Sequence, residues 1–328
     1  MLSFLIRRVG YMFVTVVFIS FISFIITELP QGTFLDVKLQ QLRMQGGSTT
    51  QSQIEEIVKR YGLNDPFYVR YWKWITGFVR GDFGMSFAYD KPVSELIWSR
   101  LGFTFGMASF SLVFSWGLSI PLGVYSATHR YTVWDYILTI FQFVGVAIPA
   151  FLLALVLVLF AIRVIRQSTV IGLFSDQFKS APWSFGKVLD MLKHLWIPVT
   201  VLTLTSTAWL TRVMRGNLLD ILNMQYIQTA RSKGLSERVV IWKHAVRNAI
   251  HPLVMSLGTA LPALISGGTI VERVLNLPST GPLMFQAMMN QDIYLAVTFL
   301  TMLSLAIVVG NFVADLLLAW VDPRIRLE

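Results

Sequence analysis

The stretch from residue 226 to residue 250, YIQTARSKGLSERVVIWKHAVRNAI, holds the residues with the clearest capacity for chemistry. Its basic side chains outnumber its single carboxylate, that of Glu237, by five to one. Such a surface recognises negative charge, either that of anionic lipid headgroups or that of a partner protein. The basic residues are Arg231, Lys233, Arg238, Lys243 and Arg247.

The spacing of small residues in this stretch predicts a helix, a tight turn and a second helix. Gly234 ends the first helix, because glycine enters a left-handed turn without steric cost. Ser236 then occupies a helix N-cap position, and Glu237 lies at the positive end of the next helix. A basic loop lying on lipid needs no such corner, so the turn favours a protein partner. We expect one apolar stripe on the second helix: Val239, Trp242, Val246, Ala249 and Ile250.

Residues for a metal site or for covalent catalysis are sparse. The chain has no cysteine, which removes disulfides, thiolate ligands and a cysteine nucleophile. A catalytic serine such as Ser266 would need a histidine beside it. The only histidine near a hydrophobic span is His251, which lies on the same predicted helix at the opposite depth. We therefore expect neither an enzyme nor a cofactor in this chain. The four histidines are scattered without an HExxH pattern: His129, His194, His244 and His251.

The composition is that of an integral membrane protein. Hydrophobic residues make up 55% of the 328 residues and charged residues only 14%, with a mean hydropathy of +0.62. Soluble domains carry about 25% charged residues. The net charge of +9 is consistent with Lys and Arg collected beside a membrane, so we expect membrane lipid and no nucleic acid as a partner.

The apolar residues fall in blocks long enough to cross a bilayer, which takes about 20 residues per helix. We predict an all-α, polytopic membrane protein with six transmembrane helices. Residues 1–29 form the N-terminal transmembrane helix, 30–99 an extracytoplasmic helical region, and 100–328 a five-helix core. The predicted spans are 9–28, 103–126, 133–162, 195–210, 250–271 and 295–320.

Charge sets the predicted orientation. Arg7 and Arg8 precede the first span and indicate a cytoplasmic N-terminus. Because six spans are an even number, the C-terminus is then expected in the cytoplasm as well. The basic segment 211–248 then lies in the cytoplasm, while 163–193 lies outside despite its own five basic residues. In the outer region we expect a helix near 54–61 and a second one capped by Asp65 and Pro66.

The sequence YIQTARSKGLSERVVIWKHAVRNAIHPLV resembles the cytoplasmic coupling loop of ABC importer permeases of the dipeptide/oligopeptide type. The stretches RYGLNDPFYVRYWKWITGFVRGDFGMS, PVSELIWSRL and ERVLNLPSTGPL, with the terminal DPRIR, resemble the same family, so the likeness runs nearly end to end. The sequence departs from the general motif at Gln228, where the glutamate that names the loop is expected, and in lacking the later leucine-proline pair.

The resemblance implies a type I ABC importer permease fold in the cell membrane. It implies two cytoplasmic ABC ATPase subunits, a homologous second permease and an extracytoplasmic solute-binding protein as partners, with ATP bound by the ATPases. A homodimer is the less typical arrangement. The resemblance implies that the solute is a peptide, an oligosaccharide or a metal complex, and it leaves the choice among them open. The residues carried over as ATPase-docking residues are Thr229, Ala230, Arg231, Gly234, Leu235 and Ser236.

An ion-coupled secondary carrier is the main alternative. Such carriers place ionisable groups or broken helices near mid-membrane, whereas Asp135 and Asp315 lie near the ends of predicted helices and are expected to pair there. A channel would show repeated polar rings, which are not visible. The residues expected along a translocation path are Gln142, Pro149 and Pro262.

Overall fold

The computed structural model describes residues 2–28, 65–167 and 169–321. The chain forms two compact units, which we describe separately. Unit 1 consists of residues 1–104 and 279–308, and unit 2 of residues 105–278 and 309–328. Each unit thus combines segments from distant parts of the sequence.

Unit 1 is built from helices of the two ends of the chain. The N-terminal helix α1 packs with α4 and with the first part of α16 through Phe24, Trp74 and Val297, which are buried together. The Trp74 indole N–H donates to Thr298 Oγ1 at 3.4 Å, and Arg70 pairs with Glu28 at 2.9 Å. Among the described residues of this unit, the helices are α1 (Leu2–Glu28), α4 (Phe67–Val79), the start of α5 (Val93–Thr128), α15 (Thr280–Met289) and the first part of α16 (Ile293–Val321).

The start of α4 differs by one residue from the expectation. Pro66 itself is the N-cap residue, and α4 begins at Phe67. No side-chain cap hydrogen bond is made at Pro66, and Asp65 pairs with Lys73 at 2.7 Å. The predicted helix near 54–61 and the terminal DPRIR lie outside the described residues.

A buried aspartate joins the segment after α4 to the start of α16 in unit 1. Asp292, between α15 and α16, accepts hydrogen bonds from the Ser86 hydroxyl at 2.5 Å and from the Ala88 N–H at 3.0 Å. The whole residue is buried. Burial raises the pKa of the Asp292 carboxyl, while these hydrogen bonds act in the opposite direction.

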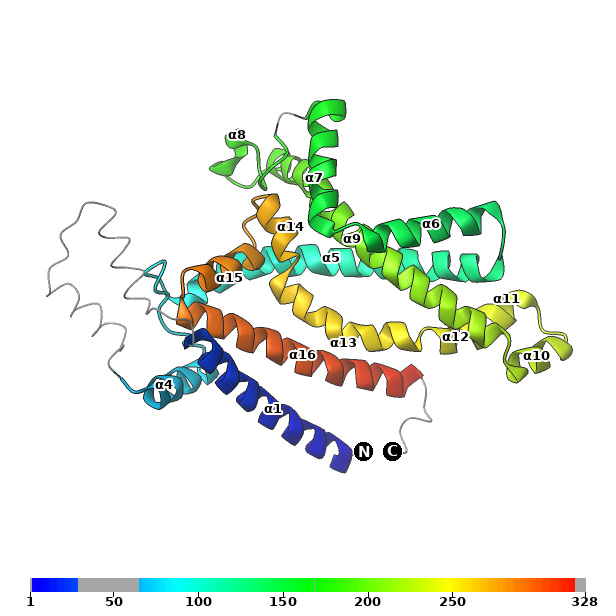
Figure 1. Ribbon diagram of the computed structural model, residues 1–328, viewed down its shortest axis with the longest axis horizontal. Helices are drawn as coiled ribbons and strands as arrows, with labels where there is room; N and C mark the ends of the chain where they lie inside the picture. The colour runs from blue at the N-terminus through cyan, green and yellow to red at the C-terminus, as the bar shows by residue number, and fades with distance from the viewer. Residues whose placement is uncertain (1, 29–64, 168, 322–328) are drawn as a thin grey trace, which may run out of the picture. The chain divides into compact units, whose positions relative to one another are not determined.

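Unit 2 contains the remaining helices of the described chain. In Figure 1, α6 runs beside α9, and the short helices α10 to α12 lie at the end of α9. Gly145 allows the close crossing of α6 and α9, since a Cβ there would lie 2.6 Å from Ala208 Cβ. Besides the rest of α5 and the last part of α16, its described elements are α6 (Val133–Ala147), α7 (Ala150–Phe160), η1 (Ala161–Ile165), α8 (Asp176–Lys179), α9 (Phe185–Leu222), α10 (Gln225–Ser232), α11 (Glu237–Val239), η2 (Val240–Ala245), α12 (Val246–Ala249), α13 (His251–Ser266) and α14 (Thr269–Val274).

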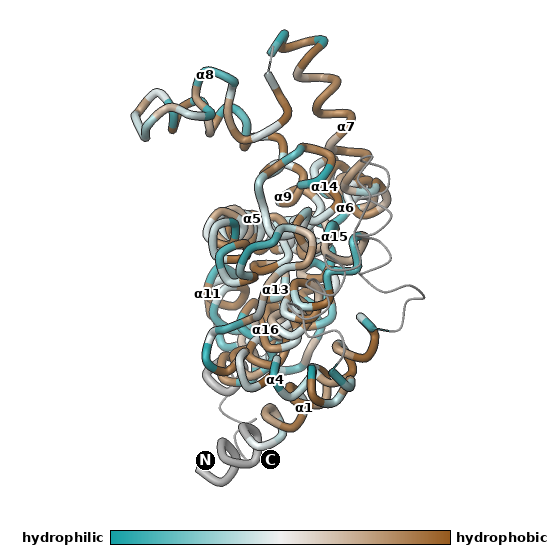
Figure 2. Tube along the Cα trace, turned by 90° about the vertical axis from the view of Figure 1, so that its left-hand side faces the viewer, coloured by the Kyte–Doolittle hydropathy of each residue, from teal (hydrophilic) through white to brown (hydrophobic). Residues whose placement is uncertain are grey.

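The third predicted span is broken. Helix α6 ends at Ala147, Pro149 caps α7, and the two helices meet at a bend of 106°. A proline disfavours helix in the residue before it, which explains the break at Ile148. Figure 2 shows α7 as predominantly hydrophobic and the region around α8 as a mixture of hydrophilic and hydrophobic residues. The predicted kink or tilt is therefore a sharp corner.

The described chain contains five helices long and apolar enough to cross a membrane, or six if the bent pair counts as one span. Helix α9 is longer than the predicted span 195–210. It continues without a break through 38 residues, or about 57 Å. The fifth span breaks at Gly267, whose φ of +60° suits glycine because it has no Cβ.

Candidate functional site

The basic segment, residues 225–249, turns at Gly234 as the sequence predicts. Gly234 has a φ of +76°, and its N–H donates to the Arg231 carbonyl at 2.9 Å. The Leu235 N–H donates to the Ala230 carbonyl at 3.4 Å. These two bonds form a Schellman cap, which satisfies carbonyls left free at the end of α10. The direction of the chain at this corner therefore depends on a residue that tolerates positive φ.

The far side of the turn is held by charge. Arg231 Nε donates to Glu237 Oε1 at 2.8 Å across the corner. The two side chains are 34% and 60% exposed, so the pair contributes at most about 1 kcal/mol. Ser236 occupies the predicted N-cap position, but its hydroxyl makes no cap hydrogen bond. The ion pair thus affects the shape of the corner more than the stability of the folded protein.

The second half of the segment differs in register from the prediction. Residues 240–245 form a π-helical turn, which adds an extra residue to the helical repeat. Val246 and Ala249 are buried as expected, whereas Val239 and Trp242 are 37% and 49% exposed. Other residues, Val240 and Ala245, are buried in their place. The five residues of the predicted stripe therefore do not share one buried face.

The inner face of the basic segment is part of the largest apolar cluster described in unit 2. Ile227 and Ala230 of α10 join buried residues of η2, α12 and α13 there. These pack with Met214 of α9 and with Ala127 of α5. At the same level, a Cβ on Gly123 would lie 2.7 Å from Met214 Cβ, so α5 and α9 cross closely. The segment is therefore fixed to two long helices.

The outer face of the segment is exposed and mixed in character. Of the predicted docking residues, Thr229, Gly234, Leu235 and Ser236 are exposed, Arg231 is half-buried and Ala230 is buried. Ala230 thus packs inward, where it contributes to the cluster. Further exposed apolar and basic side chains between residues 224 and 243 are Met224, Tyr226, Val239, Trp242, Lys233, Arg238 and Lys243.

The three residues predicted along a translocation path lie apart from one another. Gln142 is buried on α6, on the face that Gly145 turns toward α9. Pro149 is exposed at the corner between α6 and α7, and Pro262 is half-buried within α13. The structure does not bring them together.

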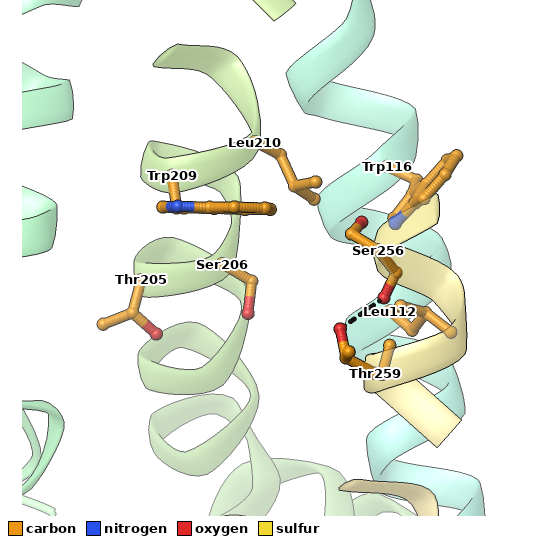
Figure 3. Close-up of a pocket in the computed structure, with 9 residues that line it drawn as sticks. Leu112, Trp116, Thr205, Ser206, Trp209, Leu210, Ser256 and Thr259 are labelled. Carbon is orange, nitrogen blue, oxygen red and sulfur yellow. Dashed lines mark hydrogen bonds between the residues drawn. The ribbon is translucent and has the colours of Figure 1, made fainter. Parts of the chain in front are cut away.

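A cavity of about 380 Å³ lies between α5, α9 and α13 in unit 2. In Figure 3, Trp209 and Ser206 of α9 extend toward Trp116 of α5 and Thr259 of α13. No charged side chain is among its lining residues. It combines two indoles with hydroxyl groups, which suits contact with uncharged and amide groups. The lining residues are Leu112, Trp116, Thr205, Ser206, Trp209, Leu210, Ser256, Thr259 and Ala260.

Sequence reasoning missed this cavity. The only pattern available was the recurrence of small hydroxylated residues in LTLTSTAWLT, residues 202 to 211 within α9. Within residues 2–28, 65–167 and 169–321, the structure also contains no group of three or more His, Cys, Asp or Glu that could hold a metal ion.

Two family models match the chain. Residues 119–327 match the family model of the binding-protein-dependent transport system inner membrane component. Residues 1–108 match the model of the N-terminal region of such membrane components. The first match includes the whole basic segment.

Individual relatives cover the chain from end to end. The chain is 35% identical to the oligopeptide transport system permease protein AppB of Bacillus subtilis over 99% of its length and 100% of the relative. It is 32% identical to the oligopeptide transport system permease protein OppB of Haemophilus influenzae, over 82% of this chain and 84% of the relative. It is 27% identical to the dipeptide transport system permease protein DppB of Alkalihalophilus pseudofirmus, over 99% of this chain and 100% of the relative.

The helical architecture, the apolar spans and the matches over both parts of the chain agree. The protein is a multi-pass membrane protein, and it belongs to the family of inner membrane components of binding-protein-dependent transport systems.

Proposed function

We propose that this chain is a permease subunit of an ATP-driven importer of peptides, with the basic segment as its docking site for a cytoplasmic ABC ATPase. The observation that carries the proposal is the exposed corner at Gly234, whose opposite face is packed into the helices of unit 2. A partner that moves this corner acts directly on the cluster containing Met214 of α9 and Ala127 of α5.

The outer face of the segment supports a protein partner. Leu235 is 41% exposed and lies directly after the capped turn, beside the exposed Lys233 and Arg238. An apolar side chain on a rigid corner with a basic rim is the arrangement expected of a docking site. Two ATPases would then bind two such permeases, of which this chain is one and a homologous chain the other.

The solute path proposed here includes the cavity between α5, α9 and α13. Pro262 lies two residues after Ala260, which lines the cavity on α13. An uncharged lining of indoles and hydroxyls can contact peptide amides without selecting one side-chain charge. Peptides are the proposed solutes because the similar proteins are named as oligopeptide and dipeptide permeases. Oligosaccharides, which stack on indoles, are the second class of solute to test.

The orientation proposed for the chain places both termini and the basic segment in the cytoplasm. The α8 region is then extracytoplasmic, on the side where a solute-binding protein delivers its cargo. Arg212, Arg215, Arg231, Lys233 and Arg238 fall on the cytoplasmic side in this orientation, in accord with the positive-inside rule.

Replacing Gly234 by valine tests the docking role. A β-branched residue is an outlier at φ +76°, and the left-handed conformation costs roughly 1–2 kcal/mol, so the corner must change its course. We expect normal membrane insertion, loss of ATPase association and loss of solute uptake. Gly216→Val is the matched control, because Gly216 is helical in α9 and a Cβ added there would meet no atom within 4 Å.

Uptake, insertion and ATPase co-purification are measured together for both variants. A Gly234→Val protein that keeps full uptake and its ATPase would contradict the docking role. Arg231→Glu provides a second measurement, since it breaks the pair with Glu237 without altering the glycine. We expect it to weaken ATPase association as well.

A further inference from the structure

A second polar cluster lies in unit 2, away from the exposed corner. It joins Ser126 in the last turn of α5, Asp135 in the first turn of α6, and Arg215 of α9. Arg215 is about two turns before the end of α9, from which the chain enters the basic segment. Residues distant in sequence therefore meet where three helices come together.

The bonds within this cluster are charge-assisted and convergent. Arg215 Nε donates to Asp135 Oδ1 and Nη2 donates to Oδ2, both at 3.1 Å. Arg215 Nε also lies 2.9 Å from the Ser126 hydroxyl oxygen, and that hydroxyl donates to Asp135. This bidentate geometry fixes both the distance between α6 and α9 and their relative orientation.

Asp135 is also held by the two residues that precede its helix. Its second oxygen accepts the Tyr131 N–H at 3.1 Å, and its own N–H donates to the Thr132 hydroxyl at 3.3 Å. Its side chain is 4% exposed and that of Arg215 27% exposed, so water competes little for the carboxylate. Breaking one side of such a pair leaves a buried charge without its partner.

The cluster is continuous with the apolar packing of the basic segment. Met214 precedes Arg215 and is fully buried in that packing, and Val124 and Ala127 of α5 lie close to Ser126 in sequence and belong to it too. Thus α5 and α9 contact the basic segment through apolar side chains, and they hold α6 through Asp135. Since α6 leads to the bend at Pro149, the position of α6 sets where that bend lies.

We propose that Asp135 and Arg215 are positioning residues that make α5, α6 and α9 move together when the basic segment is displaced. The inference rests on the proposed function, in which an ATPase displaces that segment. The role is transmission between ATP hydrolysis and transport, so the loss of these residues changes how much solute moves for each ATP consumed.

The test is a double-mutant cycle with Asp135→Asn, Arg215→Met and the two together, in the complete transporter reconstituted in vesicles. Removing both charges avoids the buried unpaired charge that each single variant leaves. The asparagine side chain of the double variant retains one oxygen, which can accept a hydrogen bond from either the Ser126 hydroxyl or the Tyr131 N–H. We expect the double variant to fold, to bind the ATPase and to hydrolyse ATP, with uptake per ATP lower by about fivefold or more.

A double variant with wild-type uptake per ATP would overturn the proposal. If that variant does not fold, Arg215→Lys carries the same test, because lysine keeps the charge without the bidentate geometry. Lower uptake per ATP in Arg215→Lys supports the role, and an unchanged ratio overturns it. The control is Asp65→Asn with Lys73→Met, an exposed pair in unit 1, which we expect to match wild type.

The two proposals fail in different ways. If the wild-type chain binds no ATPase, or Gly234→Val keeps its uptake, the docking function itself is wrong. If Gly234→Val abolishes uptake while the double variant at Asp135 and Arg215 transports normally, only the positioning role is wrong.

Discussion

Glycines at helix crossings show how single residues control the packing of unit 2. A Cβ on Gly310 of α16 would lie 2.3 Å from the backbone oxygen of Gly258 in α13, and one on Gly258 would meet the side chain and backbone of Asn311. Because backbone atoms take part in both contacts, turning a flexible side chain relieves neither. Close approach of these two helices therefore depends on the absence of side chains at both positions.

Gly310→Ala should destabilise unit 2 by about 1–3 kcal/mol, because the helices must separate to admit the methyl group. Thermal unfolding of the purified protein in detergent measures this. Gly117→Ala in α5 is the control, since a Cβ added there would meet no atom within 4 Å, and we expect no loss of stability. Equal stability of the two variants would show that the crossing is looser than described.

The buried carboxyl of Asp292 makes the stability of unit 1 depend on pH. Burial raises the pKa of its carboxyl above the ordinary 3.8, so the folded chain holds this proton to a higher pH than the unfolded chain does. The contribution of the group to stability is greatest below pH 3.8 and is lost as pH rises through the raised pKa.

We therefore expect the stability of wild type relative to Asp292→Asn to fall as pH rises from about 4. The variant keeps only one acceptor oxygen, so it loses either the shared acceptor of Ser86 and Ala88 or the acceptor of the Leu295 N–H, which costs about 1–3 kcal/mol at all pH values. Unfolding midpoints of both proteins across this range give the comparison. A difference that stays constant with pH would contradict the assignment.

Local residue roles were predictable where neighbours in sequence define them. The turn at Gly234 follows from its own short motif, and the structure confirms it. The pairing of Asp135 near a helix end was expected, but its partner Arg215 lies 80 residues away and no local pattern identifies it. The indoles of Trp116 and Trp209 both line the cavity, and their meeting is unpredictable for the same non-local reason.

Among the helices, the hydrophobic blocks located the spans, while the exact course of several of them did not follow from hydropathy. Hydropathy cannot distinguish a bilayer crossing from its helical extension, so α9 exceeded its predicted range. A π-helical turn has no strong composition of its own, so the register of η2 was missed. Pro149 gave the place of the break but not its angle of 106°.

The orientation of these helices is tested by thiol labelling. The chain has no cysteine, so Lys179→Cys in α8 and Lys233→Cys after α10 each introduce a unique thiol. We expect an impermeant thiol reagent to label the first in intact cells and the second only after the membrane is opened. The reverse pattern would invert the proposed topology.

Taken over its full length, the chain matches family models in both compact units. The long helices α5 and α16 each contribute residues to both units, so the chain passes from one unit to the other within continuous helices. The basic segment belongs entirely to unit 2, together with the cavity and with Asp135 and Arg215. The proposed docking site, the proposed positioning residues and the proposed solute path therefore all fall within unit 2.

Contact between the corner at Gly234 and an ATPase is tested most directly by site-specific cross-linking. Leu235→Cys places the only thiol of the chain on the exposed corner, and Lys179→Cys is the control on the other side of the membrane in the proposed orientation. Cross-linking in native membranes is followed by mass spectrometry of the joined partner. We predict that Leu235→Cys alone joins to a subunit with an ATP-binding phosphate loop. Cross-links only to lipid, or to no ATPase in membranes that take up the solute, would show that the corner is not a docking site.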